Sequence, residues 1–350
     1  AGSVRADGDA AGSDSMSAAT QYYIATILVY ICVNVIASWG LDLQFGITGV
    51  LNFAFILFQA AGAYTAAILS LGSSSSNGGF QQYLFGLHLP FPLPILGAML
   101  VGGALSAVIG LIILRRLRSD YQAMVMLVIS VVATTVVESV IGLFNGSAGL
   151  SLIPNPADSW GSFGSQTHTW LFVGLCVVCM VIVGLLMYAL VYSPYGRVLR
   201  GVRENDAGIE AMGRSATRAR LQVFVIGGAL GALSGALLAE FIGAWAPNEW
   251  LYPETFVFFT AVIVGGRGSV SGVAIGAALV GVGVQQAVQY MPIGSDPTVL
   301  AAMEWIITGL LTMAFLWVRP RGLLPERRRR LASRRPTQGL PPALDEAVST

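Results

Sequence analysis

The stretch LPILGAMLVGGALSAVIGLIILRRLR occupies residues 93–118, and its part 93–114 is almost entirely apolar or small. A helix of about 20 such residues crosses the hydrocarbon core of a membrane, which is roughly 30 Å thick. Arg115 and Arg116 follow directly, and basic residues beside a span favour the cytoplasmic side. The stretch therefore predicts a membrane helix whose C-terminal end lies in the cytoplasm.

The composition of the whole chain agrees with this prediction. Of its 350 residues 55% are hydrophobic and 11% are charged, and the mean hydropathy is +0.72, whereas soluble domains contain about 25% charged residues. Eight further apolar windows lie at 22–39, 50–71, 121–143, 170–192, 221–243, 255–265, 272–290 and 298–318. We therefore expect an all-α, polytopic integral membrane protein with about 8 to 10 transmembrane helices, some of them interrupted or re-entrant.

The glycines of the chain indicate where helices are interrupted and where they pack closely. Residues 40–64 contain four glycines around a short apolar stretch, and 255–265 is too short to cross a membrane before the glycines of 265–268. Non-helical backbone survives at membrane depth only against protein or beside a water-filled cavity. The glycines of 227–236, in contrast, have the three- and four-residue spacing of close helix packing.

Three regions differ in composition. Residues 1–20 are small, polar and weakly acidic, which predicts a disordered N-terminal leader. Residues 21–320 form the membrane domain. Residues 321–350 form an Arg- and Pro-rich cytoplasmic tail, in which Arg327–Arg335 either bind anionic membrane lipid or simply form a solvated end after the last span.

The arginines predict the orientation of the spans. Eighteen of them lie in four places, namely 115–118, 193–220, position 267 and 319–335, and all should be cytoplasmic. Counting spans from residue 93 then places 144–169 and 244–254 together on the opposite side. The side on which the N-terminus lies stays open, because it depends on whether 40–71 crosses the membrane completely.

The longest polar stretch between spans, 193–220, is the expected docking surface for a soluble partner. Within it Ala207, Ile209, Ala211 and Met212 form a short apolar face beside acidic residues, and Gly213 can end a helix with a positive φ. A short amphipathic helix of this kind can insert in a groove of another protein. The alternative is an ordinary solvated loop.

Several other activities find no support in the sequence. It contains no Walker-type Gly-x-x-x-x-Gly-Lys loop and no lysine, so the chain is not expected to be an enzyme, and any ATP hydrolysis must occur in a partner. Three Cys and two His are too few and too scattered for a disulfide framework or a metal site. No cofactor and no nucleic-acid partner are expected.

Four motifs, in order along the chain, resemble those of one transporter family. They are GVLNFA at 49–54 with GAYT at 62–65, RENDAGIEAMG at 203–213, GGRGS at 265–269 and PRGL at 320–323. They resemble the permease subunits of branched-chain amino acid ABC importers. The first motif is similar to the LivH type and the second to the LivM type of subunit.

The resemblance implies partners and a location. It implies a second homologous permease subunit, two ABC ATP-binding subunits that use ATP and magnesium, an extracytoplasmic solute-binding protein, and a multi-pass place in a bacterial inner or plasma membrane. Residues 203–213 would be the coupling loop. Its expected contacts with the ATP-binding subunit are Arg203, Glu204, Asn205, Asp206, Glu210, Ala211 and Gly213.

A second set of residues is expected to line the solute pathway. It comprises Asn52, Phe55, Tyr64, Glu138, Asn145 and Ser147. Phe55 stands where relatives usually carry His, which favours a more apolar or differently shaped solute. Glu138 shares a helical face with Thr134 and Thr135, and the glycine-rich turn at 145–149 has backbone N–H groups that could bind a carboxylate.

Two alternatives remain at this point. Permeases for urea or short amides share the motifs, so the solute is less well defined than the machinery. A different class, an ion-coupled secondary transporter or channel with Glu138 as its ion site, would need no ATP-binding partner.

Overall fold

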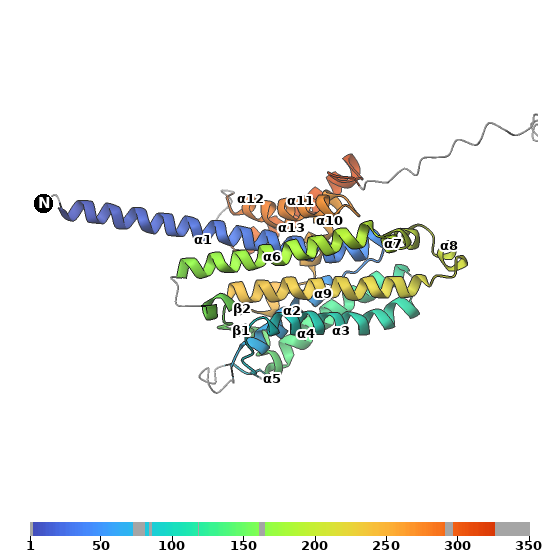
Figure 1. Cartoon of the computed structure of the whole chain (residues 1–350), viewed down its shortest axis with the longest axis horizontal. Helices are drawn as coiled ribbons and strands as arrows, with labels where there is room; N and C mark the ends of the chain where they lie inside the picture. The colour runs from blue at the N-terminus through green and yellow to red at the C-terminus, as the bar shows by residue number, and fades with distance from the viewer. Residues whose placement is uncertain are drawn as a thin grey trace, which may run out of the picture.

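The computed structural model describes residues 3–72, 81–83, 86–117, 119–160, 165–290 and 297–325. Arg118 and the tail segment Arg327–Arg335 therefore lie outside the described residues, and so does most of the predicted tail 321–350. The described chain is a bundle of helices with one pair of two-residue strands, and the predicted all-α class is confirmed (Figure 1).

Each of the nine predicted apolar windows coincides with a helical segment. In order these segments are α1 (Ser3–Asp42), α2 (Phe55–Ser70), α3 (Leu93–Arg116), α4 (Ser119–Ser139), α6 (Ser165–Tyr192), α9 (Ala216–Ile242), α10 (Pro253–Gly265), the run α11 (Val270–Ala277), η5 (Ala278–Val284) and α12 (Gln285–Gln289), and α13 (Pro297–Val318). Within the described residues six are long and apolar enough to cross a membrane. The protein is a multi-pass integral membrane protein.

Short elements connect these segments. They are η1 (Leu43–Ile47), α5 (Ile141–Phe144), η2 (Gly146–Ala148), β1 (Leu150–Ser151), η3 (Pro156–Trp160), α7 (Pro194–Glu204), α8 (Asp206–Ala211), β2 (Ala244–Trp245) and η4 (Pro247–Trp250). Strands β1 and β2 are antiparallel and pair Leu150 with Trp245 and Ser151 with Ala244.

The predicted interruptions are present. After α1 the chain forms the π-helix η1, leaves helical geometry over 48–54 and begins α2 at Phe55, which packs beside Gly231 near the middle of α9. Because α2 has 16 residues, it is about 24 Å long and does not span a 30 Å core by itself. Helix α10 has 13 residues and ends at Gly265, and the next residue, Gly266, has φ +113°.

Small residues bring α9 against its neighbours. A Cβ atom added to Gly62 of α2 would lie 2.0 Å from the carbonyl oxygen of Ala232, and one added to Gly228 would lie 2.5 Å from the Cβ of Ser106 in α3. A larger residue at either position would force the backbones apart. The glycine spacing of 227–236 therefore positions α2 and α3 directly on α9.

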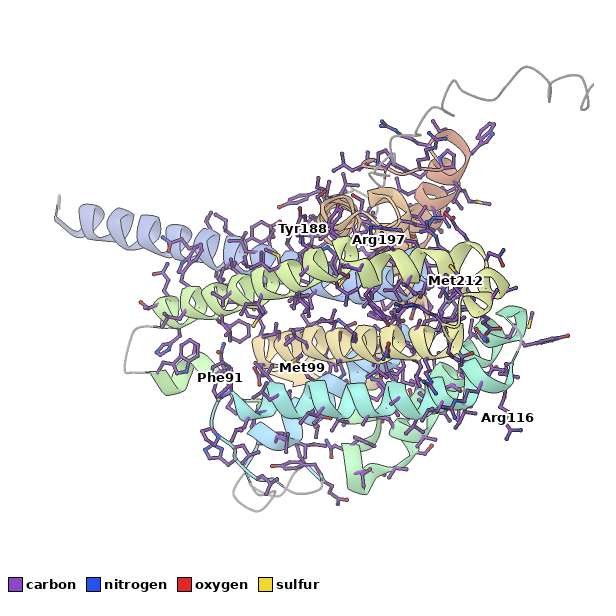
Figure 2. All side chains as sticks on the ribbon, turned by 45° about the vertical axis from the view of Figure 1, so that its right-hand side comes forward. Phe91, Met99, Arg116, Tyr188, Arg197 and Met212 are labelled. Atoms are coloured by element: carbon purple, nitrogen blue, oxygen red, sulfur yellow. The ribbon has the colours of Figure 1, made fainter. Side chains whose placement is uncertain are left out.

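The bundle has two distinct ends. At one end lie α7, α8 and Arg116, which we call the Arg-rich end, and at the other lie Phe91 and the paired strands, which we call the strand end (Figures 1 and 2). The backbone N–H of Ile153 donates to Gly243 O at 3.0 Å beside the strands. The prediction that 144–169 and 244–254 share one side is therefore confirmed.

The N-terminal side, which the sequence left open, follows from the path of the first two helices. Asp42 at the end of α1 bonds to Gly268 at the Arg-rich end, while Tyr23 near its start bonds to Gln286 at 2.5 Å, and the N-terminus extends beyond the strand end (Figure 1). Helix α2 then returns towards the strand end, where Leu71 O accepts from His88 N at 3.3 Å. If the Arg-rich end is cytoplasmic, α1 enters from outside.

Helix α1 begins well before the apolar span. The helix extends back to Ser3, into the segment 1–20 for which the composition predicted disorder. Lengthening a helix that is already formed requires no new nucleus, so the alanines of this segment can continue the helix that the apolar span begins.

Candidate coupling site and solute pathway

Two short helices form the segment between α6 and α9. The side chain of Ser193 accepts the N–H of Gly196, and Pro194 occupies the first turn of α7, as is typical of a helix start. Leu199 and Val202 of α7 are buried against the bundle. At Asn205 the backbone becomes extended, with φ −158°, and the Asn205 side chain accepts the N–H of Gly208 to begin α8.

Helix α8 confirms the predicted short helix that glycine ends, but its apolar face is divided. Ile209 is 7% exposed because it packs on Gly201, where an added Cβ would lie 2.7 Å from its Cδ1. Met212 is 71% exposed, and Ala207 and Ala211 are exposed too. Ile209 therefore holds α8 on α7, while the other three apolar residues are open to a partner.

The expected coupling residues also divide into two groups. Arg203 donates through its guanidinium to the carbonyl oxygen of Gly46, and Asp206 forms an ion pair with Arg220 at 2.7 Å, so both are directed towards the chain itself. That all seven contact an ATP-binding subunit stays a prediction. The remaining five are exposed at the surface, namely Glu204, Asn205, Glu210, Ala211 and Gly213.

Contacts across the Arg-rich end bring together motifs that are far apart in the sequence. The carboxylate of Asp42 accepts the backbone N–H of Gly268 at 2.9 Å. The N–H of Leu323 donates to Val264 O at 2.8 Å, so the PRGL turn closes against the end of α10. Since Arg203 also lies against Gly49, three of the motifs and the 49–54 part of the first motif neighbour one another here, whereas GAYT at 62–65 lies further along α2.

Asn52 and Phe55 are structural residues of the helix break in the described chain. Asn52 is fully buried, donates to Gln44 Oε1 at 2.7 Å and accepts the N–H of Ala54 at 3.1 Å. Phe55 is also fully buried and packs against Phe258 with ring centroids 5.8 Å apart. A broken helix needs polar caps and dense packing around its free backbone groups, and these two residues supply them. That they line a pathway stays a prediction.

The other pathway candidates lie towards the strand end. Tyr64 is 4% exposed and contacts Phe144 and Trp250, with ring centroids 5.2 and 6.3 Å away. In the described part of the chain, neither the Tyr64 hydroxyl nor the Trp250 indole N–H makes a hydrogen bond. This buried aromatic cluster is closed by the turn that follows α5.

That turn contains Asn145 and Ser147. Asn145 has φ +61°, donates to Gly149 O at 2.7 Å and accepts the N–H of Gln82 at 3.1 Å. Ser147 is exposed, and so is Glu138, whose backbone lies beside Gly146. The structure therefore gathers Tyr64 and the turn at one end, with Glu138 nearby but directed to the surface.

Sequence reasoning missed two polar residues that the structure makes central. Asp42 is fully buried, and Gln44 is fully buried and donates to Phe224 O at 2.9 Å, so both connect η1 to other helices. The signal was present, since an acid or an amide within an apolar span requires a partner at membrane depth.

Comparison with known proteins identifies the family and several relatives. A family model described as branched-chain amino acid transport system / permease component matches residues 23–316. A probable branched-chain amino acid transport permease protein LivM of Methanocaldococcus jannaschii is 26% identical over 334 aligned residues, which cover 87% of this chain and 94% of the relative. No solved structure matches the chain.

Relatives of both permease types are found. A high-affinity branched-chain amino acid transport system permease protein LivM of Salmonella typhimurium is 27% identical over 319 residues, covering 85% of this chain and 69% of the relative. The LivH protein of the same organism is 24% identical over 294 residues, covering 81% and 89%. Because the family model matches most of its length, the chain belongs to the family of permease components of branched-chain amino acid transport systems.

Proposed function

We propose that this chain is one of two permease subunits of an ATP-driven importer, and that it provides half of the pathway for a branched-chain amino acid or a related small polar solute. The observation that carries the proposal is the exposed ridge of α8, which projects from the Arg-rich end beyond the membrane helices (Figure 1). Its family membership supports the same role.

The ridge has the properties of a docking helix. Met212, Ala207 and Ala211 supply an apolar surface, and Glu204 and Glu210 are exposed beside it. Apolar contacts supply affinity in a helix-in-groove interface, and the charges fix the orientation of the partner. Ile209 packs on Gly201 of α7, and Asp206 of α8 forms an ion pair with Arg220 of α9. A displacement of α8 therefore also moves α7 and α9.

The remaining parts of the importer follow from this assignment. Separate ATP-binding subunits hold ATP and magnesium and carry out hydrolysis against α8. A second permease subunit completes the pathway, and a solute-binding protein delivers solute at the strand end. Differential binding of the ATP-binding subunits to the inward- and outward-facing states supplies the coupling free energy.

The solute is proposed from the relatives, whose names state branched-chain amino acids. The buried position of Phe55 weakens the argument that this residue selects a different solute, because its ring packs in the helix break. The names of the relatives favour the importer over an ion-coupled transporter that uses Glu138, a residue that is exposed in this chain.

The test is purification of the tagged chain from its native membrane, followed by identification of co-purifying proteins and measurement of ATP hydrolysis. We expect an ATP-binding subunit in the wild-type complex and its loss in the double variant Glu204→Arg with Glu210→Arg. Glu249→Arg, a charge reversal at an exposed site of the strand end, is the matched control and should retain the subunit.

Either of two results would contradict the proposal. One is uptake of tritiated leucine by the chain alone in liposomes without ATP, which would favour the secondary transporter. The other is normal association with the ATP-binding subunit and normal ATP-driven uptake by the Glu204/Glu210 double variant. This result would show that α8 is not the docking helix.

A further inference from the structure

Arg203 lies in the coupling segment, yet its side chain is directed away from the exposed ridge. From α7 it reaches η1, where its guanidinium donates to the carbonyl oxygen of Gly46 across 157 positions of sequence. The aliphatic part of the Arg203 side chain lies over Gly49, and a Cβ added to Gly49 would lie 3.2 Å from Arg203 Cγ. Gly49 also has φ +76°, so the chain turns sharply below the arginine.

The Gly46 carbonyl lies where a helix end needs a partner. Helix η1 ends at Ile47, and the last carbonyl oxygens of a helix find no N–H donor within that helix. Gly46 is buried, so water cannot easily replace a lost partner. A positive charge is also favourable at a helix C-terminus, because the aligned peptide dipoles place negative charge there.

On its other side η1 is bound to the turn between α10 and α11. Asp42 accepts the N–H of Gly268, and the ring of Phe45 lies 5.6 Å from the guanidinium carbon of Arg267. A Cβ at position 46 would lie 1.8 Å from Asp42 Oδ1, so this close arrangement requires glycine. Helix η1 is therefore fixed to two elements of the Arg-rich end, one of which is the coupling segment.

The helix break follows η1 directly. Residues 48–54 connect η1 to α2, and Asn52 in the break bonds to Gln44 of η1, which in turn bonds to Phe224 of α9. A shift of η1 therefore moves the hydrogen bonds that hold the break. Interrupted helices in membrane proteins are sites where small rearrangements change access to a pathway.

We propose that the Arg203–Gly46 contact transmits movement of α7 and α8 to the helix break at 48–54, and that Arg203 is a positioning residue for coupling rather than a contact of the ATP-binding subunit. This inference deepens the function proposed above and rests on it. It assigns separate tasks within one motif, since the exposed ridge binds the partner and Arg203 connects that ridge to the membrane domain.

The experiment uses the complete importer in proteoliposomes, with tritiated leucine as the transported probe and with ATP hydrolysis measured in parallel. Arg203→Ala should keep its ATP-binding subunits and its hydrolysis, while the leucine transported per ATP falls about tenfold, the scale expected for one lost hydrogen bond to a charged group. Arg115→Ala, the loss of an exposed arginine at the end of α3 and outside the coupling segment, is the control and should leave this ratio unchanged.

A second measurement separates transmission from simple support of the fold. Hydrogen exchange of residues 43–54 should change when ATP is added to the wild-type complex. In Arg203→Ala the ATP-dependent change should vanish at 43–54 but persist at 204–213. A purely structural role would instead alter exchange at 43–54 equally with and without ATP, and that result would overturn the proposal.

A conservative variant keeps the test decisive if Arg203→Ala does not fold. Lysine retains the charge but lacks the planar fork of arginine, so Arg203→Lys should transport less leucine per ATP than the wild type and more than Arg203→Ala. A wild-type ratio in both variants would overturn the inference. Loss of the ATP-binding subunit from Arg203→Ala would also overturn it, since Arg203 would then be a docking residue.

These outcomes differ from a failure of the proposed function. If the wild-type chain carries no ATP-binding subunit, the importer assignment itself is wrong. If the wild-type importer transports leucine and the Arg203 variants transport as much leucine per ATP, the importer assignment is supported and the proposed role of Arg203 is wrong.

Discussion

The Arg-rich end and the strand end are stabilised by different kinds of contact. At the Arg-rich end charged side chains bind backbone groups of distant elements, as Arg203 does with Gly46 and Asp42 with Gly268. At the strand end neutral groups connect the elements. Examples are the Asn145 amide and the strand pair of Leu150 with Trp245. Hydrogen bonds to charged groups are roughly twice as strong as neutral ones. The Arg-rich end therefore has the stronger individual contacts between elements, one from a basic and one from an acidic side chain.

The largest effect is expected at Gly46. In Gly46→Val the new side chain would overlap the Asp42 carboxylate, and we expect a loss of stability of about 3 kcal/mol, as for a severe overpacking change. The measurement is the thermal unfolding of the purified complex in detergent. Gly142→Ala, for which no atom lies within 4 Å of the added Cβ, is the control. Wild-type unfolding of Gly46→Val would show that η1 and Asp42 can move apart.

Removal of the Asp42 carboxylate tests the charged contact itself. Asp42→Ala leaves the N–H of Gly268 without its acceptor in a buried place, which should lower stability by about 2 kcal/mol. Asp42→Asn keeps an oxygen acceptor and should lose less. Equal unfolding temperatures for the two variants would mean that the hydrogen bond to Gly268 is not what the carboxylate contributes.

At the strand end Asn145→Ala should have a smaller effect. It removes the bonds to Gly149 O and from Gln82 N and places alanine at φ +61°, for an expected loss of about 1 kcal/mol in stability. Ser147→Ala, at an exposed site two residues away, should unfold like the wild type. A loss larger than that of Asp42→Ala would reverse the comparison between the two ends.

The smallest effect on stability is expected for Tyr64→Phe. Because its hydroxyl makes no hydrogen bond in the described chain, its removal should change stability by less than about 0.5 kcal/mol. Leucine uptake is the informative measurement. Unchanged uptake would make Tyr64 a packing residue, whereas reduced uptake in a stable variant would show that the hydroxyl contacts solute or water in another state of the importer.

Much of the fold could be predicted because its signals are local in the chain. Apolar windows such as 93–114 become helices since only a helix satisfies its own backbone in lipid. The break at 48–54 was indicated by nearby glycines, and the end of α8 by Gly213, whose φ is +76°. Helix α7 was missed although Ser193 and Pro194 mark its start, because the polar segment was interpreted as one loop with a single helix.

The candidate site was less predictable because it depends on which face of each element is buried. Spacing grouped Ile209 with Met212, yet the glycine at 201 admits only Ile209 to the bundle. Asn52 and Phe55 resembled pathway residues by their place in a motif, but a motif does not state whether a residue serves the pathway or the helix break beside it.

The sequence by itself determined the all-α membrane class, the nine apolar segments, the two interruptions and the side on which arginine gathers, since each follows from hydropathy, glycine placement or charge along a short stretch. Tertiary structure alone decided that the N-terminus of α1 lies at the strand end, that Arg203 meets Gly46, and that Asp42 meets Gly268. These contacts join residues more than 150 positions apart, and such pairings arise only when the helices pack and their remaining polar groups must find partners away from water.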